Sequence, residues 1–141
     1  MEALNPSLVE NTLKIRDRSS VKKTFSQRDV ELFANLSGDV NPVHLDEDIA
    51  TESIFKARVV HGMLVASLFS TIIGTQMPGP GAIYLGQNLK FKAPVFLGEE
   101  VEAILEVVSI RKDKPIATLK AVCRKQDGTV VIEGEAVVLL P

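Results

Sequence analysis

The pattern of hydrophobic and polar positions divides the chain into a helical part and a strand part. From Val59 to Gly74 the sequence is apolar nearly all round and contains no Asp, Glu, Lys or Arg. A helix with this pattern is buried on most sides and has no single wet face. It is too short and too interrupted to span a membrane, and the Met-Pro-Gly-Pro-Gly segment at 77–81 ends it. The pattern therefore predicts one buried helix.

After residue 81, polar and apolar residues alternate, which predicts β-strands. The predicted strands are 82–94 with a possible bulge near Gly86, 99–112, 116–125 and 130–139, and a hairpin turn occupies 126–129. Four strands that meander after one buried helix can hide that helix only by enclosing it. The fold class is therefore α+β, with a curved antiparallel sheet wrapped round one long helix.

Shorter elements precede the buried helix. Residues 12–24 alternate loosely and support at most a first strand. Ser26 and Asp29 have the spacing of a helix N-cap and its first-turn acid, which predicts a helix over 27–36 that Gly38 stops. Residues 46–53 predict another turn or two of helix.

Composition indicates one globular domain spanning residues 1–141, because a chain of this length buries roughly two-thirds of its unfolded surface. The net charge of −2 comes from 16 basic and 18 acidic residues that are well mixed. Without a basic stripe, nucleic acid is not an expected partner. Cys123 is the single cysteine, which excludes an intrachain disulfide and predicts a buried thiol. Residues 1–9 lack the features of a secretory signal, so we expect a cytoplasmic protein with no membrane partner.

The first candidate for chemistry is the segment from Gly38 to His44, which places the Asp39 carboxylate and the His44 imidazole five positions apart. Pro42 has no amide hydrogen and pushes Asn41 out of the helical region, while Gly38 readily adopts the left-handed conformation. We expect a tight irregular turn, neither regular helix nor strand, that brings the two side chains together for proton transfer. On local grounds alone, an ordinary Asx turn explains these residues at least as well.

Metal binding is a second interpretation of the same region. His44, Asp46, Asp48 and His61 carry nitrogen and oxygen ligand atoms, but these are the only two histidines and the spacing matches no metal motif. We expect no metal. The chain also lacks a nucleophile elbow, a phosphate loop and a cofactor fingerprint.

The second candidate is the start of the buried helix at His61 and Gly62. The first amides of a helix are unsatisfied and carry the positive end of its dipole, so they can polarise a carbonyl oxygen. Gly62 would let that oxygen approach closely, although a glycine that only lets the chain bend is an equally good explanation. Ser70 could point a hydroxyl back at the Asp39–His44 turn, or bond its own helix backbone. Together these groups fit proton transfer to and from water beside a polarised carbonyl.

The segments Ser37–Asp46 and Val60–Leu64, with Ala50 and Phe55 between them, resemble the signature of the MaoC-like, (R)-specific enoyl-CoA hydratase family of hot-dog proteins. The resemblance continues through 78–87, 91–95 and 134–138, and covers roughly Phe25 to Pro141. It is strongest with the short single-domain hydratases that supply polyhydroxyalkanoate synthesis. The glycine that often leads into the first strand of the family is absent, and Glu10-Asn11 stands instead.

The resemblance implies reversible syn hydration of a trans-2-enoyl-CoA to an (R)-3-hydroxyacyl-CoA, with no cofactor apart from the CoA of the substrate. Asp39 and His44 become the catalytic pair, and the Gly62 amide polarises the thioester carbonyl. Ser70 becomes a pocket contact, and we also count Asn41 among the substrate-binding residues. An adjacent carboxylate favours the imidazolium, so Asp39 is the preferred base and His44 the proton donor. The sequence leaves open which of the two protonates C2.

An apolar slot for the acyl chain is also expected, and its candidate lining residues are Leu64, Leu68, Ile73 and Val137. Each of them taken singly is equally explained as plain core. The family pairs two sheets edge to edge, which implies a homodimer and protects the exposed sheet edges.

Three other functions remain open from sequence. A 3-hydroxyacyl-ACP dehydratase would use the same pair, a hot-dog acyl-CoA thioesterase would use a similar helix terminus with a carboxylate, and a binding module would hold acyl-CoA without chemistry. Asp39 and His44 lie on one loop that suits a bridging water, which favours hydration over hydrolysis.

Overall fold

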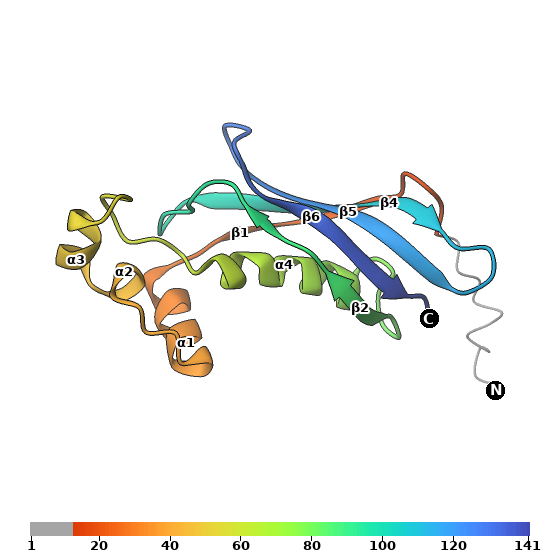
Figure 1. Cartoon of the computed structure of the whole chain (residues 1–141), viewed down its shortest axis with the longest axis horizontal. Helices are drawn as coiled ribbons and strands as arrows, with labels where there is room; N and C mark the ends of the chain where they lie inside the picture. The colour runs from red at the N-terminus through yellow and green to blue at the C-terminus, as the bar shows by residue number, and fades with distance from the viewer. Residues whose placement is uncertain (1–12) are drawn as a thin grey trace.

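The computed structural model describes residues 13–141, which form a curved antiparallel sheet lying over one long helix (Figure 1). The strands are β1 (Arg18–Thr24), β2 (Ile83–Gln87), β3 (Lys90–Phe91), β4 (Glu100–Ile110), β5 (Ile116–Lys125) and β6 (Val130–Leu139). Their order across the sheet is β1-β4-β5-β6-β2, and β3 also pairs with β6. The predicted fold class is confirmed, and β1 and β2 are the outer strands.

The long helix is α4 (Gly62–Thr75), as predicted for this segment, but it is buried on one face and not on most sides. Its buried residues are Val65, Ala66, Leu68, Phe69, Ile72 and Ile73. They pack into one core with the inward side chains of the sheet, such as Leu105, Leu119 and Ile132. Met63, Ser67, Ser70 and Thr71 on the other face are exposed, so it is the packing of one face of α4 against the sheet that positions its first residue relative to the strands.

Three short helices precede α4 and lie beyond one end of the sheet (Figure 1). They are α1 (Gln27–Ser37), α2 (Pro42–Leu45) and α3 (Glu47–Glu52). The predicted capping box at the start of α1 is present, with Ser26 and Asp29 bonding each other's backbone amides at 2.9 and 3.1 Å. Gly38 ends α1 in the left-handed region, with φ 81°. The chain therefore leaves α1 directly into the Asp39–His44 segment.

The structure corrects three further sequence expectations. The predicted strand 82–94 is two short strands, because the register shifts at the bulge between Tyr84 and Gly86 and the chain then turns at residues 88–89. The Asp39–His44 segment is not irregular throughout, since residues 42–45 form the single helical turn α2. Pro42 occupies the first turn, where a missing amide hydrogen is tolerated. The first strand begins at residue 18, not 12; residue 12 lies outside the described residues.

Two other expectations concern the chain as a whole. Cys123 is buried, as predicted, and burial raises the pKa of its thiol to about 12. Within residues 13–141, no helix is long and apolar enough to cross a membrane. The prediction of a single domain over residues 1–141 stays a prediction, as does the absence of a signal at residues 1–9, which lie outside the described part.

Candidate active site

The Asp39–His44 segment takes its shape from short side chains that bond neighbouring backbone amides. The hydroxyl of Ser37 accepts from the Asp39 amide at 3.1 Å, and the Asp39 carboxylate accepts from the Asn41 amide at 3.2 Å. The Asn41 side-chain oxygen in turn accepts from the Val43 amide at 3.2 Å and caps α2. These are Asx-type bonds. The Asn41 carboxamide oxygen is therefore already engaged in holding the turn.

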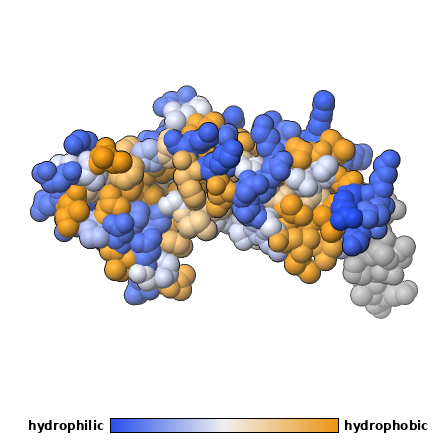
Figure 2. All heavy atoms as spheres, viewed as in Figure 1, coloured by the Kyte–Doolittle hydropathy of each residue, from blue (hydrophilic) through white to orange (hydrophobic). Residues whose placement is uncertain are grey.

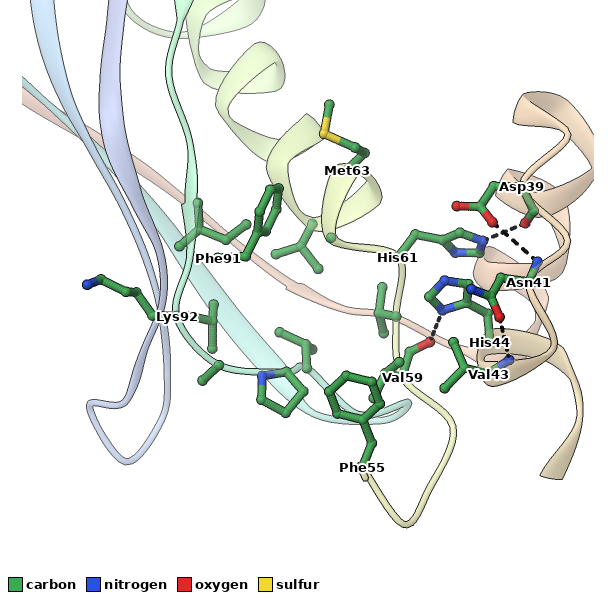
Figure 3. A pocket seen from close by; sticks show the side chains of 18 residues that line it. Asp39, Asn41, Val43, His44, Phe55, Val59, His61, Met63, Phe91 and Lys92 are labelled. Carbon is green, nitrogen blue, oxygen red and sulfur yellow. Dashed lines mark hydrogen bonds between the residues drawn. The ribbon is translucent and has the colours of Figure 1, made fainter. Parts of the chain in front are cut away.

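An extended segment, Arg58–His61, lies along this turn and holds it; we call it the clamp segment. The Arg58 guanidinium donates from Nε to the His44 carbonyl at 2.8 Å, and the Val59 amide donates to the Val43 carbonyl at 3.3 Å. The His44 ring reaches back through Nδ1 to the Val59 carbonyl at 2.7 Å (Figure 3). The backbone and the ring of His44 are thus fixed by adjacent residues of one segment.

The last residue of the clamp segment, His61, makes the remaining bond to the turn. Its Nε2 lies 3.0 Å from the Asp39 carbonyl oxygen (Figure 3). The His61 ring stacks on the His44 ring with centroids 3.8 Å apart, and the edge of Phe33 packs on it at 4.9 Å. With 2 % of its surface exposed, His61 is the one buried polar residue among residues 13–141.

The bond to Val59 decides the tautomer of His44. A backbone carbonyl only accepts, so Nδ1 of His44 carries the hydrogen and, in the neutral ring, Nε2 is a bare acceptor. Burial lowers the pKa of His44 below its ordinary value, and the His61 ring acts in the same direction. The hydrogen bond to Val59 and the charge of Asp39 act the other way and are outweighed. The expectation of a charged imidazolium is therefore wrong for this geometry.

Asp39, His44 and His61 bring one ligand atom each within 4.8 Å of one another, whereas Asp46 and Asp48 do not join them. Ligands of a tetrahedral zinc ion lie about 3.4 Å apart, given bonds of about 2.1 Å. Two acceptors that share one water lie about 4.6 Å apart, given hydrogen bonds of about 2.8 Å. A separation of up to 4.8 Å accommodates a shared water between Asp39 and His44.

The start of α4 borders the same site. The amides of Leu64 and Val65 donate to the His61 carbonyl at 3.0 and 3.1 Å. Within the described part of the chain, this leaves the amides of Gly62 and Met63 without an acceptor. A helix start with free amides carries the positive end of the helix dipole and attracts an oxygen that is gaining negative charge.

A hollow of about 550 Å³ connects these groups (Figure 3). Asp39, Asn41, His44, His61 and Gly62 line it, and the other lining residues are mostly apolar, including Phe55, Val60, Phe91, Val95 and Ile132. The structure thus brings together Asp39, His44, Asn41 and Gly62, as the sequence predicts. A hollow with mainly apolar walls and a few converging polar groups is the usual form of a small-molecule site.

Ser70 does not reach this hollow. It lies eight residues beyond Gly62, which is about 12 Å along a helix axis. Ser70 lines a separate hollow of about 470 Å³ between α4 and β2, together with Met63, Ala66 and Leu85. Met63 borders both hollows. A role for Ser70 in substrate binding stays a prediction.

The four residues proposed for an acyl slot are also placed away from Asp39 and His44. Leu68 and Ile73 are buried in the core, and Leu64 packs against it, because these positions face the sheet along α4. Val137 is half-buried on β6, where it pairs with Gly86. None of the four is among the residues of the Asp39–His44 hollow. The residues that do form its apolar wall come from residues 55–65, 91–95 and 131–132.

Sequence reasoning missed the clamp segment and Phe91. Val59 acts on this turn through its backbone groups, which leave no residue pattern to find, and Arg58 donates from its side chain to a backbone carbonyl, so its partner depends on the fold. His61 was noted as part of the helix start and as a candidate metal ligand, but its burial next to His44 depends on tertiary packing. Phe91 was recognised as an apolar position of a strand and as part of the resemblance over 91–95, but neither signal predicts its contact with Gly62.

The fold and the site define a hot-dog protein with an acid–imidazole pair beside a helix start. Residues 9–127 match the family model of the MaoC-like domain, and the chain belongs to this family. It is 50 % identical to the (R)-specific enoyl-CoA hydratase of Aeromonas caviae over 130 residues. The aligned region covers 92 % of this chain and 97 % of that protein. It is 47 % identical to the (R)-specific enoyl-CoA hydratase of Rhodospirillum rubrum, over 92 % of this chain and 89 % of that protein.

The solved structures show the same relationship. The (R)-hydratase from A. caviae involved in PHA biosynthesis superposes with a TM-score of 0.91 and 49 % identity, over 94 % of this chain and 100 % of that chain. The similarity therefore extends over the sheet, the buried helix and the segment that carries Asp39 and His44.

The ring of Phe91 leaves little room for a side chain at Gly62. A Cβ at this position would lie 2.7 Å from Cε1 and 2.9 Å from Cδ1 of Phe91. Because Phe91 is 53 % exposed, its ring can move aside at a modest loss of packing. We expect Gly62→Ala to lower the free energy of unfolding by about 1 kcal/mol. In a Phe91→Ala background the same substitution should lower it by about 0.5–1 kcal/mol less. Chemical denaturation of the four proteins measures this coupling.

Gly74→Ala is the matched control, since it lies in the same helix and a Cβ there would meet nothing within 4 Å. It should be neutral or stabilising and should not couple to Phe91→Ala. Equal losses for Gly62→Ala in both backgrounds would contradict the contact.

Proposed function

We propose that this enzyme catalyses the reversible syn hydration of a trans-2-enoyl-CoA to an (R)-3-hydroxyacyl-CoA. The observation that carries the proposal is the convergence of Asp39, His44 and the Gly62 amide on one hollow. The family relationship to (R)-specific enoyl-CoA hydratases supports the reaction class and the (R) configuration. The reaction consumes only water and the substrate, so no cofactor or metal is proposed.

Asp39 and His44 hold the attacking water. The carboxylate and the bare Nε2 of neutral His44 are both acceptors, so one water can donate a hydrogen to each of them. With both hydrogens held, a lone pair of the water oxygen is left to face C3 of the substrate. The pair therefore orients the nucleophile before it takes a proton from it.

The start of α4 stabilises the charge that the attack produces. As the oxygen bonds to C3, the electrons of the double bond move through C2 onto the thioester oxygen, which becomes an enolate. The free amide of Gly62 meets that oxygen at the positive end of the helix dipole. Losing one donor of this kind typically costs about 3 kcal/mol in the transition state.

The proton that leaves the water completes the reaction at C2. It passes from the water to one member of the pair and is returned to C2 on the face from which the oxygen added, which gives syn addition. Because His44 is neutral and its Nε2 is an acceptor, His44 can take the proton as well as Asp39. The preference for Asp39 as sole base is therefore replaced by a shared role.

We also propose that the protein is a homodimer formed through the β2 edge. Ile83, Tyr84 and Leu85 are three consecutive exposed residues on this outer strand, with 53, 37 and 51 % of their surface exposed. Hydrophobic side chains gather over the region of β2 (Figure 2). An apolar outer strand beside the hollow between α4 and β2 is a surface that a second copy would cover.

A cytoplasmic location is also part of the proposal, and the lone buried Cys123 fits a reducing compartment.

The reaction is tested with crotonyl-CoA. We expect the purified protein to consume it at the absorbance of the conjugated enoyl group without releasing free thiol, and to form the (R)-3-hydroxy product. Asp39→Asn and His44→Ala should each lower kcat at least about a hundredfold, the low end for acid–base groups. Asp48→Asn, an exposed acid outside the hollow, is the control. Thiol release with the enoyl bond intact would indicate a thioesterase, and unchanged rates in both variants would exclude the assigned pair.

The pH dependence tests the state of His44. The pKa of His44 lies below the ordinary 6.5, mainly through burial, and the charged or titratable groups against it are Asp39, His61 and Arg58. Protonation at Nε2 removes the acceptor for water, so kcat/KM should rise with pH to a plateau with an inflection below 6.5. Initial rates at low crotonyl-CoA concentration measure it. A rate that falls as His44 loses its proton would contradict the role of the neutral ring.

The homodimer is tested by placing a charge on its proposed edge. Leu85→Lys should convert the protein from dimer to monomer in sedimentation velocity, because a lysine on an edge strand opposes pairing. Ile15→Lys is the matched control at a similarly exposed apolar residue beside β1, with 58 % of its surface exposed. It should leave the dimer intact. Dissociation by Ile15→Lys alone would place the interface on the β1 edge.

A further inference from the structure

His61 has features that the proposed reaction does not use. It is almost completely buried, it holds the Asp39 carbonyl through Nε2, and it stacks on His44. Its other ring nitrogen, Nδ1, is buried and has no hydrogen-bond partner within the described part of the chain. A buried polar atom without a partner is destabilising and is retained where it serves another purpose.

The bond to Asp39 fixes which nitrogen of His61 carries the hydrogen. Since the Asp39 carbonyl only accepts, Nε2 of His61 donates and Nδ1 keeps a lone pair. His44 has the opposite arrangement, with the hydrogen on Nδ1 and the lone pair on Nε2. The two stacked rings are therefore complementary tautomers.

Two aromatic contacts hold the His61 ring in place. It stacks on the His44 ring with centroids 3.8 Å apart, and the Phe33 ring of α1 packs against it with centroids 4.9 Å apart. Because the ring is also buried, it cannot move without changing these contacts.

We infer that His61 is a positioning residue for the hydration reaction: its Nε2–H holds the Asp39 backbone while its ring holds His44 at the start of α4. The inference rests on the proposed function for its effect on rate. His61 joins three parts of the site, because it bonds the residue that carries the carboxylate, stacks on the imidazole, and precedes Gly62 in the chain. A displacement of its ring would misplace the water-holding pair relative to the Gly62 amide, and small misplacements of reacting groups lower rates strongly.

Two substitutions separate the hydrogen bond from the packing. His61→Phe keeps an aromatic ring between Phe33 and His44 but removes the donor to Asp39. His61→Gln removes the ring but can offer an amide N–H near the position of Nε2. We expect His61→Phe to lower kcat about tenfold to a hundredfold with KM changed less than about threefold, and His61→Gln to recover most of that loss. The acid limb of the pH–rate profile should move to higher pH in both variants, because the His61 ring no longer opposes protonation of His44.

The wild-type protein also gives a readout that does not depend on activity. The chain has two histidines, so ¹⁵N-histidine labelling of the untagged protein yields only two ring systems in long-range ¹H–¹⁵N spectra. At about pH 7.5, well above the usual histidine value, we expect His44 with its hydrogen on Nδ1 and His61 with its hydrogen on Nε2. His61→Gln identifies the His61 signals by their loss.

Two outcomes would overturn the inference: a hydrogen on Nδ1 of His61 in the wild-type spectra, or a His61→Phe variant with the kcat and acid limb of the wild type. Absence of crotonyl-CoA hydration by the wild-type protein is a different result. It would remove the proposed function while the tautomers of the two rings could still be determined.

Discussion

The clamp segment, Arg58–His61, is the constraint on which the rest of the site depends. The Asp39–His44 turn has only a single helical turn of its own, so its internal Asx bonds cannot fix its position relative to the sheet. The clamp segment supplies that position through four hydrogen bonds to the turn, at 2.7 to 3.3 Å, from three of its residues. Its remaining residue, Val60, donates to the Val95 carbonyl at 2.8 Å and so ties the segment to the loop before β4.

Burial of α4 makes the clamp segment effective. One face of the helix packs into the core beneath the sheet, and this packing sets the position of its first turn. His61 is both the last residue of the clamp segment and the N-cap of α4. The Asp39–His44 pair and the amide proposed to stabilise the enolate are therefore connected through one residue, His61, which contacts both members of the pair and precedes Gly62.

The sequence predicted the elements of the fold well because their causes are local. The alternation of polar and apolar residues predicted β4, β5 and β6. The bounds of α1 were predicted from its capping box and Gly38, and they differ from the observed helix by one residue at its end. The acyl slot stays a prediction: Leu68 and Ile73 face the core, while the wall of the Asp39–His44 hollow comes from segments far apart in the chain. Asp39, His44 and Gly62 could be selected as candidates from their own neighbourhoods, but the contacts of Arg58, His61 and Phe91 arise only after folding.

The protonation state of His44 shows why local sequence misleads at such a site. A carboxylate five positions away suggests an imidazolium, and the charge of Asp39 does act in that direction. Burial acts more strongly, because removing the ring from water disfavours its charged form, while the exposed Asp39 carboxylate remains partly screened. The result is a pair of acceptors instead of a base and an acid. In the proposed reaction two acceptors orient a water by both of its hydrogens, and a separation of up to 4.8 Å between the ligand atoms of Asp39 and His44 leaves room for that water.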